Sequence, residues 1–259
     1  HLMFILLFLS LPVRYAMSQE FRHYDTKDGL SSIEVTSVCE NRNFLWIATT
    51  DGLNRFDGKN FKVYKRENGN NNSLAANNIE TLMFDSKGVL WIGLKTGGVD
   101  IYDPQKGTFT HLKDLIEGKC PHRVISIFED SEKSIWLGTW EEGVYKLTPD
   151  GKQHYRISSY YNGYIISSIV EKPKGYLWFG SYFGYFIHNL SNKQWIERPE
   201  NLSITQFLDN GQKDAIWCST WNLGLIKMAW NGEAPLNTTL APPRYTVSKV
   251  PSYFRMLQR

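Results

Sequence analysis

The residue types that most often catalyse reactions or bind metal ions are scattered in this chain. None of its six histidines stands in an HExxH motif or four residues from another histidine, and none has a cysteine at ligand spacing. We therefore expect no metal site. No GxSxG elbow, P-loop or GxGxxG sequence occurs, so we predict no cofactor and no catalytic residue. Carboxylates from distant segments could still meet in the fold.

The adjacent carboxylates of Glu141 and Glu142 come nearest to a general acid–base pair. Neighbouring residues of a strand point to opposite faces of a sheet, so two consecutive carboxylates do not readily cooperate. We interpret them as solvated turn charges. Cys39, Cys120 and Cys218 are an odd number without CxxC spacing, and we expect no structural disulfide.

The charge balance argues against nucleic acid as a partner. The chain has 29 Lys and Arg residues against 26 Asp and Glu, for a formal net charge of +3 at pH 7. These basic residues are dispersed along the sequence, whereas nucleic-acid binding favours a concentrated basic face.

A short sequence motif that occurs five times indicates which elements would position any site. Each copy has a tryptophan in an apolar segment, a small residue two positions later, and a glycine that follows the hairpin. At intervals of 45, 45, 42 and 39 residues stand the tryptophans Trp46, Trp91, Trp136, Trp178 and Trp217. A repeat of this period indicates small units that must stack to bury their apolar faces.

Each copy reads as four short strands joined by tight turns. Four strands per unit of about 40–45 residues are typical of a β-propeller blade. We predict an all-β propeller of antiparallel blades near residues 33–65, 78–112, 122–156, 163–197 and 203–240. The tryptophans are interpreted as packing between blades, with the small residues allowing close approach of the sheets. A ring of five or six blades is compatible with the length of the chain.

Residues at the same offset from each blade tryptophan occupy equivalent places around a propeller axis. Four positions after the tryptophans stand Thr50, Lys95, Trp140, Tyr182 and Trp221. This offset lies on the hairpin after the second strand, which opens on the same face as the connections 66–77, 113–122 and 157–163. We expect three aromatic rings to form an arc at one mouth, completed by Lys95 and Thr50.

Tyr160, Tyr161 and Glu141 are expected near this arc. Aromatic rings at a pocket rim suit the apolar C–H faces of sugars, while a few polar groups bind the hydroxyls. One hypothesis is that the arc contacts a carbohydrate or another domain of a larger receptor. The other is that these rings wedge between blades, like the tryptophans behind them.

Two parts of the sequence resemble a known family. FRHYDTKDGLSS from Phe21, continuing through IEVTSVCENRNFLWIATTDGLNRFDG, resembles the start of the periplasmic sensor ectodomain in bacterial, Bacteroidetes-type hybrid two-component systems. The repeated LWIG with its later glycine and aromatic-Asp ending is similar to the regulator-propeller repeat of that family. The likeness covers about residues 20–229.

The resemblance implies an amino-terminal fragment of a receptor in which seven-bladed propellers precede an immunoglobulin-like domain, a membrane helix and a kinase half. It favours a seven-bladed ring cut short within the single propeller domain at 19–259, and oligosaccharides as ligands. The implied partners are the remaining blades and domains of the receptor and, in the full-length protein, a second copy. Tyr245–Val250 alternates like one more inner strand, with no sixth tryptophan phrase after it.

Residues 1–18 are predicted to be a signal peptide. An apolar run of 10 residues from Leu2 to Leu11 is too short to span a bilayer as a helix, and small residues precede a cut before Gln19. The start of this peptide could be missing, because the chain begins at His1. The alternative is a buried first strand or helix. We expect a periplasmic location, with the full-length protein anchored in the inner membrane.

Three functions are compatible with this fold, because fold alone does not decide function. The resemblance favours a non-enzymatic sensor segment that binds a ligand or relays a rearrangement of domains. A secreted lyase or hydrolase acting on glycans would need carboxylate, histidine or tyrosine groups converging at the central mouth. A protein-interaction scaffold would show no affinity for saccharides.

Overall fold

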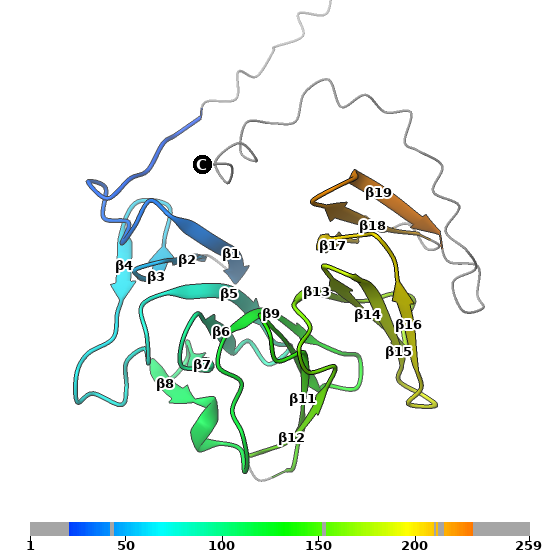
Figure 1. Cartoon of the computed structure of the whole chain (residues 1–259). Coiled ribbons are helices and arrows are strands. Elements are labelled where there is room, and N and C mark those ends of the chain that lie inside the picture. Colours follow the sequence, from blue (N-terminus) through cyan, green and yellow to red (C-terminus); the bar gives the residue numbers. More distant parts are fainter. Residues whose placement is uncertain (1–20, 42–43, 152–153, 210, 212–214, 230–259) are drawn as a thin grey trace, which may run out of the picture.

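The computed structural model describes residues 21–41, 44–151, 154–209, 211 and 215–229 (Figure 1). Apart from the short 3-10 turn η1 (Leu112–Asp114), the regular structure of this part of the chain consists of β-strands. They form five antiparallel sheets in which the strand order follows the sequence, four with four strands and the last with three described strands. The predicted all-β propeller of antiparallel blades is confirmed.

Each sheet is one blade, and its strands follow in chain order. Blade 1 consists of β1 (Val35–Asn41), β2 (Phe44–Thr49), β3 (Gly52–Phe56) and β4 (Phe61–Tyr64). Blade 2 consists of β5 (Ile79–Phe84), β6 (Leu90–Leu94), β7 (Val99–Asp103) and β8 (Thr108–His111). Blade 3 consists of β9 (Val124–Glu129), β10 (Ile135–Thr139), β11 (Val144–Pro149) and β12 (Tyr155–Tyr160). Blade 4 consists of β13 (Ile166–Glu171), β14 (Tyr176–Ser181), β15 (Gly184–Asn189) and β16 (Trp195–Pro199). Blade 5 contains β17 (Ile204–Leu208), β18 (Ala215–Thr220) and β19 (Gly224–Ala229).

The first strand of each blade lies beside the first strand of the next, from β1 through β5, β9 and β13 to β17. Figure 1 shows the blades succeeding one another in this order, from blue and cyan for blade 1 to orange for blade 5. The first strands therefore face the hub, and the fourth strands lie at the rim.

Aspartate residues close the first hairpin of two blades and hold the blade tryptophan. In blade 2, Asp85 Oδ1 accepts hydrogen bonds from the N–H groups two and four residues later, both at 2.9 Å. Its other oxygen accepts the Trp91 Nε1–H at 3.0 Å. Asp130 makes the same three contacts in blade 3, with Trp136 Nε1 at 2.7 Å. One carboxylate thus satisfies both the turn backbone and the buried indole N–H.

Each of the first four blade tryptophans is covered by the following blade. Their exposed fractions are 2%, 1%, 0% and 1% for Trp46, Trp91, Trp136 and Trp178. Trp46, for example, packs in one apolar cluster with Ile79 and Leu90 of blade 2. The indoles therefore form the joints between blades, where large rings contribute most.

The small residue two positions after the tryptophan faces the next blade. A Cβ atom added at Gly138 would lie 2.1 Å from Ser126 Oγ of its own blade and 2.5 Å from the Ile166 carbonyl oxygen of blade 4. A glycine is also needed in the hairpin between the second and third strands, as Gly143 of blade 3 shows. Gly143, with φ of 74°, donates its N–H to the Tyr164 carbonyl at 3.1 Å, and an added Cβ would lie 2.1 Å from Tyr161 O.

Blades 3 and 4 extend beyond their predicted ends at 156 and 197. The segment from Ile157, predicted to begin a connection, belongs to β12, which pairs with β11 up to the Val144 and Tyr160 pair. The prediction was wrong here because the polar Ser158 and Ser159 read as a loop, although a fourth strand at the rim tolerates polar residues. The predicted signal peptide and Tyr245–Val250 lie outside the described residues.

Substituting Gly138 by alanine should destabilise the protein, because the new methyl group would meet backbone and side-chain atoms across a joint. Overpacking of this kind costs about 1–3 kcal/mol. Gly107→Ala is the matched control, since its φ of 69° is unfavourable for alanine but its Cβ would meet nothing within 4 Å, and we expect about 1 kcal/mol. Urea unfolding midpoints compare the two variants. Equal loss of stability in both would contradict the close approach of blades 3 and 4.

Candidate functional site

One mouth of the propeller is assembled by a backbone hydrogen bond that recurs in four blades. The donors are the residues four positions after the tryptophan, and each acceptor is the carbonyl directly before the first strand of the same blade. The N···O distances are 2.9–3.2 Å for Thr50, Lys95, Trp140 and Trp221. These residues therefore occupy equivalent places beside the first strands of their blades.

The Trp140 ring contacts an arginine of its own blade and an aromatic ring of the next blade. The guanidinium carbon of Arg123 lies 4.1 Å from the centroid of its ring, a cation–π arrangement. Arg123 in turn contacts Glu80 of blade 2, with Nε and Nη2 each 2.8 Å from Oε1. Tyr182 of blade 4 meets the indole edge to face, with centroids 6.2 Å apart. A chain of polar and aromatic contacts thus joins three consecutive blades around the mouth.

The other predicted arc residues are more open. Trp221 in blade 5 is 56% exposed, and Lys95 in blade 2 is exposed as well. Tyr182 and Thr50 are partly buried. The arc ring of blade 5 is therefore more exposed than those of blades 3 and 4.

The backbone of Tyr160 and Tyr161 lies against the hairpin that carries Trp140 and Glu141. A Cβ added at Gly143 would lie 2.3 Å from Tyr160 O, and the Gly163 N–H donates to the Glu141 carbonyl at 2.9 Å. Tyr161 stacks on Phe186 at 4.1 Å between ring centroids, and Tyr160 lies 5.1 Å from the Trp195 ring. Both tyrosines pack against the apolar cluster shared by blades 3 and 4. The two tyrosines therefore lie beside the arc hairpin of blade 3, and their rings pack into the joint between blades 3 and 4. Burial, followed by the nearby Glu197 charge, raises the pKa of Tyr161, so its phenol stays protonated.

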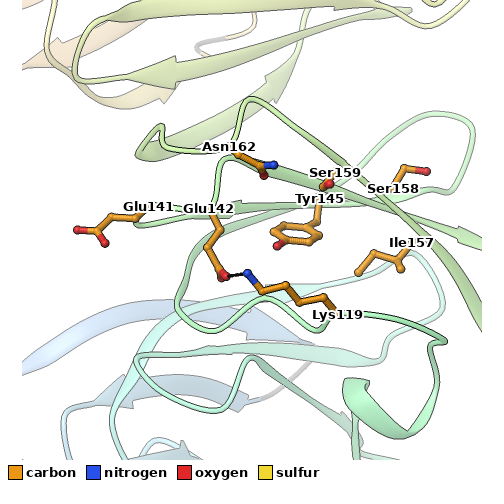
Figure 2. A pocket seen from close by; sticks show the side chains of 8 residues that line it. All are labelled: Lys119, Glu141, Glu142, Tyr145, Ile157, Ser158, Ser159 and Asn162. Carbon is orange, nitrogen blue, oxygen red and sulfur yellow. Dashed lines mark ion pairs between the residues drawn. The ribbon is translucent and has the colours of Figure 1, made fainter.

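A polar pocket of about 440 Å³ lies between the connection from blade 2 and the outer strands of blade 3 (Figure 2). It is lined by Lys119, Glu141, Glu142, Tyr145, Ile157, Ser158, Ser159 and Asn162. In Figure 2, Glu142 reaches towards Lys119, whereas Glu141 points away from the other side chains. The two carboxylates diverge, as their adjacent positions predict, and do not form an acid–base pair.

The pocket contains a fixed ion pair. Lys119 Nζ lies 2.5 Å from Glu142 Oε1, and the His122 N–H donates to Glu142 Oε2 at 2.7 Å. Burial pushes the pKa of Glu142 upwards, but these two hydrogen bonds outweigh it and the pKa lies below its ordinary value. Burial and the Glu142 charge raise the pKa of Tyr145. Besides Glu141, the pocket therefore offers at neutral pH one carboxylate paired with one ammonium, a neutral phenol, hydroxyls and an amide.

Tyr145 lines the pocket from a third-strand position that carries a polar anchoring residue in blades 1 and 2, and Phe186 or Ile226 in blades 4 and 5. Asn54 and Asp100 hold the equivalent position in the third strands of blades 1 and 2, opposite the residue after the tryptophan. Asn54 accepts the N–H of Ser31 at 2.9 Å, and Asp100 accepts that of Ala75 at 2.7 Å. Both bonds tie the entering chain segment to its blade. In blade 3 the phenol ring is instead a buried wall of the pocket.

Sequence reasoning missed Arg123, Glu80, Lys119, Tyr145 and Asn162. Each of these types occurs at its repeat position in one blade only, so no recurring pattern marked it. No group of three or more His, Cys, Asp or Glu residues with the arrangement of a metal site occurs in the described residues. The three cysteines are free thiols. Burial raises the pKa of Cys39 and Cys218 to about 12, so these two thiols stay protonated at neutral pH and are poor nucleophiles.

Comparison with known proteins gives one family and several structures. Residues 118–141, which span the pocket loop, β9, β10 and Trp140, match the family described as "Two component regulator propeller". Histidine kinase P4 of Formosa agariphila is 36% identical over 56 residues, which are 21% of this chain and 4% of that kinase. These matches confirm the resemblance to regulator-propeller proteins that the repeated phrase indicates.

Two crystal structures from B. thetaiotaomicron share the fold. Both are extracellular domains of hybrid two-component systems. The first has a TM-score of 0.68 and 21% identity and covers 85% of this chain, and the second has a TM-score of 0.64 and 16% identity and covers 76%. PorZ, a surface component of the type-IX secretion system of Porphyromonas gingivalis, has a TM-score of 0.58, with 15% identity over 76% of this chain and 32% of its own.

The chain spans 31% and 27% of the lengths of these two extracellular domains. Within the described residues, no helix has the length and apolar character that crossing a membrane requires.

One titratable residue of the core has a clear consequence for stability. His188 in β15 is 3% exposed, its ring lies 4.4 Å from that of Trp195, and its Nδ1 has no hydrogen-bond partner. Burial, followed by the charges of Lys146 and Lys193, lowers its pKa from 6.5 to about 4. The folded protein therefore holds this imidazole neutral over a pH range in which the unfolded chain takes up a proton.

Stability should fall as the pH drops from 6.5 towards 4, because only the unfolded state gains the His188 proton in this range. The pKa difference corresponds to a loss of about 3 kcal/mol at the acid end. Replacing His188 by phenylalanine should remove this part of the pH dependence, measured as the free energy of unfolding in urea at each pH. His23→Phe, at an exposed position, is the control. An unchanged slope for the His188 variant would show that this imidazole is protonated in the fold.

Proposed function

We propose that this chain is part of the sensor region of a two-component receptor and takes no part in catalysis itself. The observation that carries the proposal is the match of residues 118–141 to the two-component regulator propeller, since these residues build the mouth and the pocket wall of blade 3. The shared fold with extracellular domains of hybrid two-component systems supports it. The predicted signal peptide and periplasmic location are part of the same proposal.

The ligand proposed for this region is an oligosaccharide bound at the mouth of blades 3 to 5. Trp221 offers an open ring at 56% exposure, and Tyr182 and Trp140 lie edge to face in the two preceding blades. Sugar rings stack their C–H faces on aromatic side chains, and their hydroxyls need a few directed partners. Arg123 and Glu80 supply charged groups close to Trp140.

The pocket behind Glu142 supports a role in binding more than one in hydrolysis. Its carboxylate is already paired with Lys119, and a pKa below the ordinary value is opposite to that of a general acid for glycoside cleavage. Glu141 points away from the other lining side chains (Figure 2), so the two carboxylates do not face a common point. A glycan hydrolase or lyase is therefore the weaker alternative.

Binding of a panel of neutral gluco-, xylo- and manno-oligosaccharides and acidic galacturono-oligosaccharides to the chain tests this proposal by calorimetry. Replacing Trp140 or Trp221 by alanine should weaken the affinity for the ligand found by about three- to tenfold, since an aromatic contact contributes about 0.5–1.5 kcal/mol. Phe183→Ala is the matched control, because Phe183 is 66% exposed beside Tyr182 but does not occupy the arc position.

Unchanged affinity in both tryptophan variants would remove the ligand assignment. Turnover of a polysaccharide would support the glycan-degrading enzyme and contradict the sensor. The absence of any saccharide affinity would favour an interaction scaffold.

A further inference from the structure

Two pockets occupy equivalent places in consecutive blades. The polar pocket of blade 3 lies where the connection from blade 2 passes the outer strands of blade 3. A smaller cavity of about 260 Å³, the blade 2 pocket, lies where the connection 66–77 from blade 1 passes the end of β8 and η1. The strand register shows the equivalence, because Asp100 pairs with His111 in blade 2 as Tyr145 pairs with Ser159 in blade 3.

The connection that forms one wall of the blade 2 pocket is held by hydrogen bonds along its length. Near its start, the Glu67 N–H donates to Ser73 Oγ at 3.0 Å, and the Ser73 hydroxyl donates to the Asn70 carbonyl at 2.8 Å. Further along, Asn72 Oδ1 accepts the N–H of Phe109 in β8 at 2.7 Å. The wall is therefore formed by the protein itself, as is usual for sites that bind small molecules.

A buried carboxylate orients the imidazole that lines this pocket. Asp100 is 0% exposed, and its Oδ2 accepts the Ala75 N–H at 2.7 Å. Its other oxygen, Oδ1, lies 2.6 Å from His111 Nδ1. Among the described residues, His111 Nε2 has no hydrogen-bond partner. Because Nδ1 is engaged by the carboxylate, Nε2 is the ring nitrogen that is left to meet a ligand in the pocket.

An anion at Nε2 would favour the protonated form of this imidazole. Burial raises the pKa of the Asp100 carboxyl, and the hydrogen bonds from Ala75 and His111 oppose this rise. A buried carboxylate is stabilised by a positive charge on its partner. The imidazolium would therefore be compensated by Asp100 on one side and by the bound anion on the other.

Two further cations line the blade 2 pocket. Arg66 and Lys113 are exposed and belong to no ion pair within the described part of the chain. Glu67 and Asp114 also line it, and the Glu67 carboxylate accepts the Asn70 amide at 2.6 Å. With the imidazolium, three cationic groups face two carboxylates, a surplus of one positive charge. This balance suits a monoanion better than a dianion.

The remaining polar groups of the pocket suit hydroxyls. Asn68 and Asn71 both line it, and each amide offers donors and an acceptor, as a hydroxyl requires. The cavity of about 260 Å³ is smaller than the roughly 300–1,000 Å³ of pockets for drug-sized ligands. The ligand is therefore a small polar molecule.

We propose that the blade 2 pocket binds a small hydroxylated monocarboxylate, with the carboxylate at His111 and Lys113 and the hydroxyls at the asparagine amides. This site is separate from the mouth, and the proposal is independent of the oligosaccharide proposed there. The equivalent pocket of blade 3 lacks this chemistry, because Tyr145 and Ser159 stand at the places of the buried acid and the imidazole.

Calorimetry on the full 259-residue chain tests the proposal with D-gluconate as the probe. D-Glucitol is the matched neutral ligand, because it has the same chain of hydroxyls but no carboxylate. Gluconate should bind, and glucitol should bind at least about tenfold more weakly, since hydrogen bonds to charged groups are the stronger ones. Sulfate, a dianion without hydroxyls, should also bind more weakly than gluconate.

His111→Asn separates ligand binding from folding. The new amide can still donate to Asp100 from the place of Nδ1, but it has no group at the place of Nε2. The affinity for gluconate should fall at least about tenfold, with little change in the urea unfolding midpoint. Lys113→Gln, at an exposed position, should weaken binding about two- to fivefold. Lys87→Gln, exposed in the first hairpin of the same blade, is the matched control and should leave the affinity unchanged.

The imidazole can also be observed directly by proton NMR. The Hε1 resonance of His111 is assigned by its loss in the His111→Asn variant. Gluconate should shift this resonance in the direction of protonation, and glucitol at the same concentration should leave it in place. Trp221→Ala at the mouth should not change gluconate binding, so that a failure of this site and a failure of the oligosaccharide site can be told apart.

The proposal would be overturned by the absence of gluconate binding, or by equal affinity for glucitol. Gluconate binding that is unchanged in both pocket variants would place the anion elsewhere. An equal loss in Lys87→Gln and Lys113→Gln would show attraction by net charge only. Tighter binding of sulfate than of gluconate would exclude a monocarboxylate as the ligand. If His111→Asn fails to fold, Lys113→Gln decides the matter.

Discussion

Burial of the first four blade indoles by the following blade is the contact on which the rest of this structure depends. A sheet of four short strands cannot cover its own tryptophan, so the apolar first strand of the next blade must do so. The joint is close because a glycine stands at Gly93, Gly138 and Gly180, where an added Cβ would meet the next first strand. The orientation of the indole is also fixed in two blades, because its N–H donates to Asp85 or Asp130.

This joint also positions the candidate site. Once the first strands lie side by side at the hub, the backbone bonds of Lys95, Trp140 and Trp221 place the second hairpins around one opening. Arg123 then links blade 2 to blade 3 through Glu80 and the Trp140 ring. The pocket at Lys119 and Glu142 lies where the connection from blade 2 passes beside the outer strands of blade 3. Recognition of a ligand would thus depend on side chains that differ from blade to blade, held on a backbone framework that is the same in each blade.

Features that recur in every blade could be predicted from the sequence. Residues that occur at their repeat position in one blade only could not. Five tryptophans at near-constant spacing predicted the blades, and their offsets predicted which residues occupy equivalent backbone positions in the repeat. The end of blade 3 was misplaced because a polar rim strand resembles a loop, and β12 extends further than its composition indicates. Arg123, Lys119 and Tyr145 gave no signal, because their partners come from neighbouring segments that only the assembled blades bring together.

Hydroxyl-radical footprinting of the tryptophans, read by mass spectrometry, tests the central claim most directly. Trp46, Trp91, Trp136 and Trp178 are at most 2% exposed, whereas Trp221 is 56% exposed. The four indoles should therefore be oxidised at least about tenfold more slowly than Trp221 in the folded chain, and all five at similar rates in denaturant. Oxidation of the four at the rate of Trp221 in the folded chain would contradict the account, because it would mean that consecutive blades do not cover one another's tryptophans.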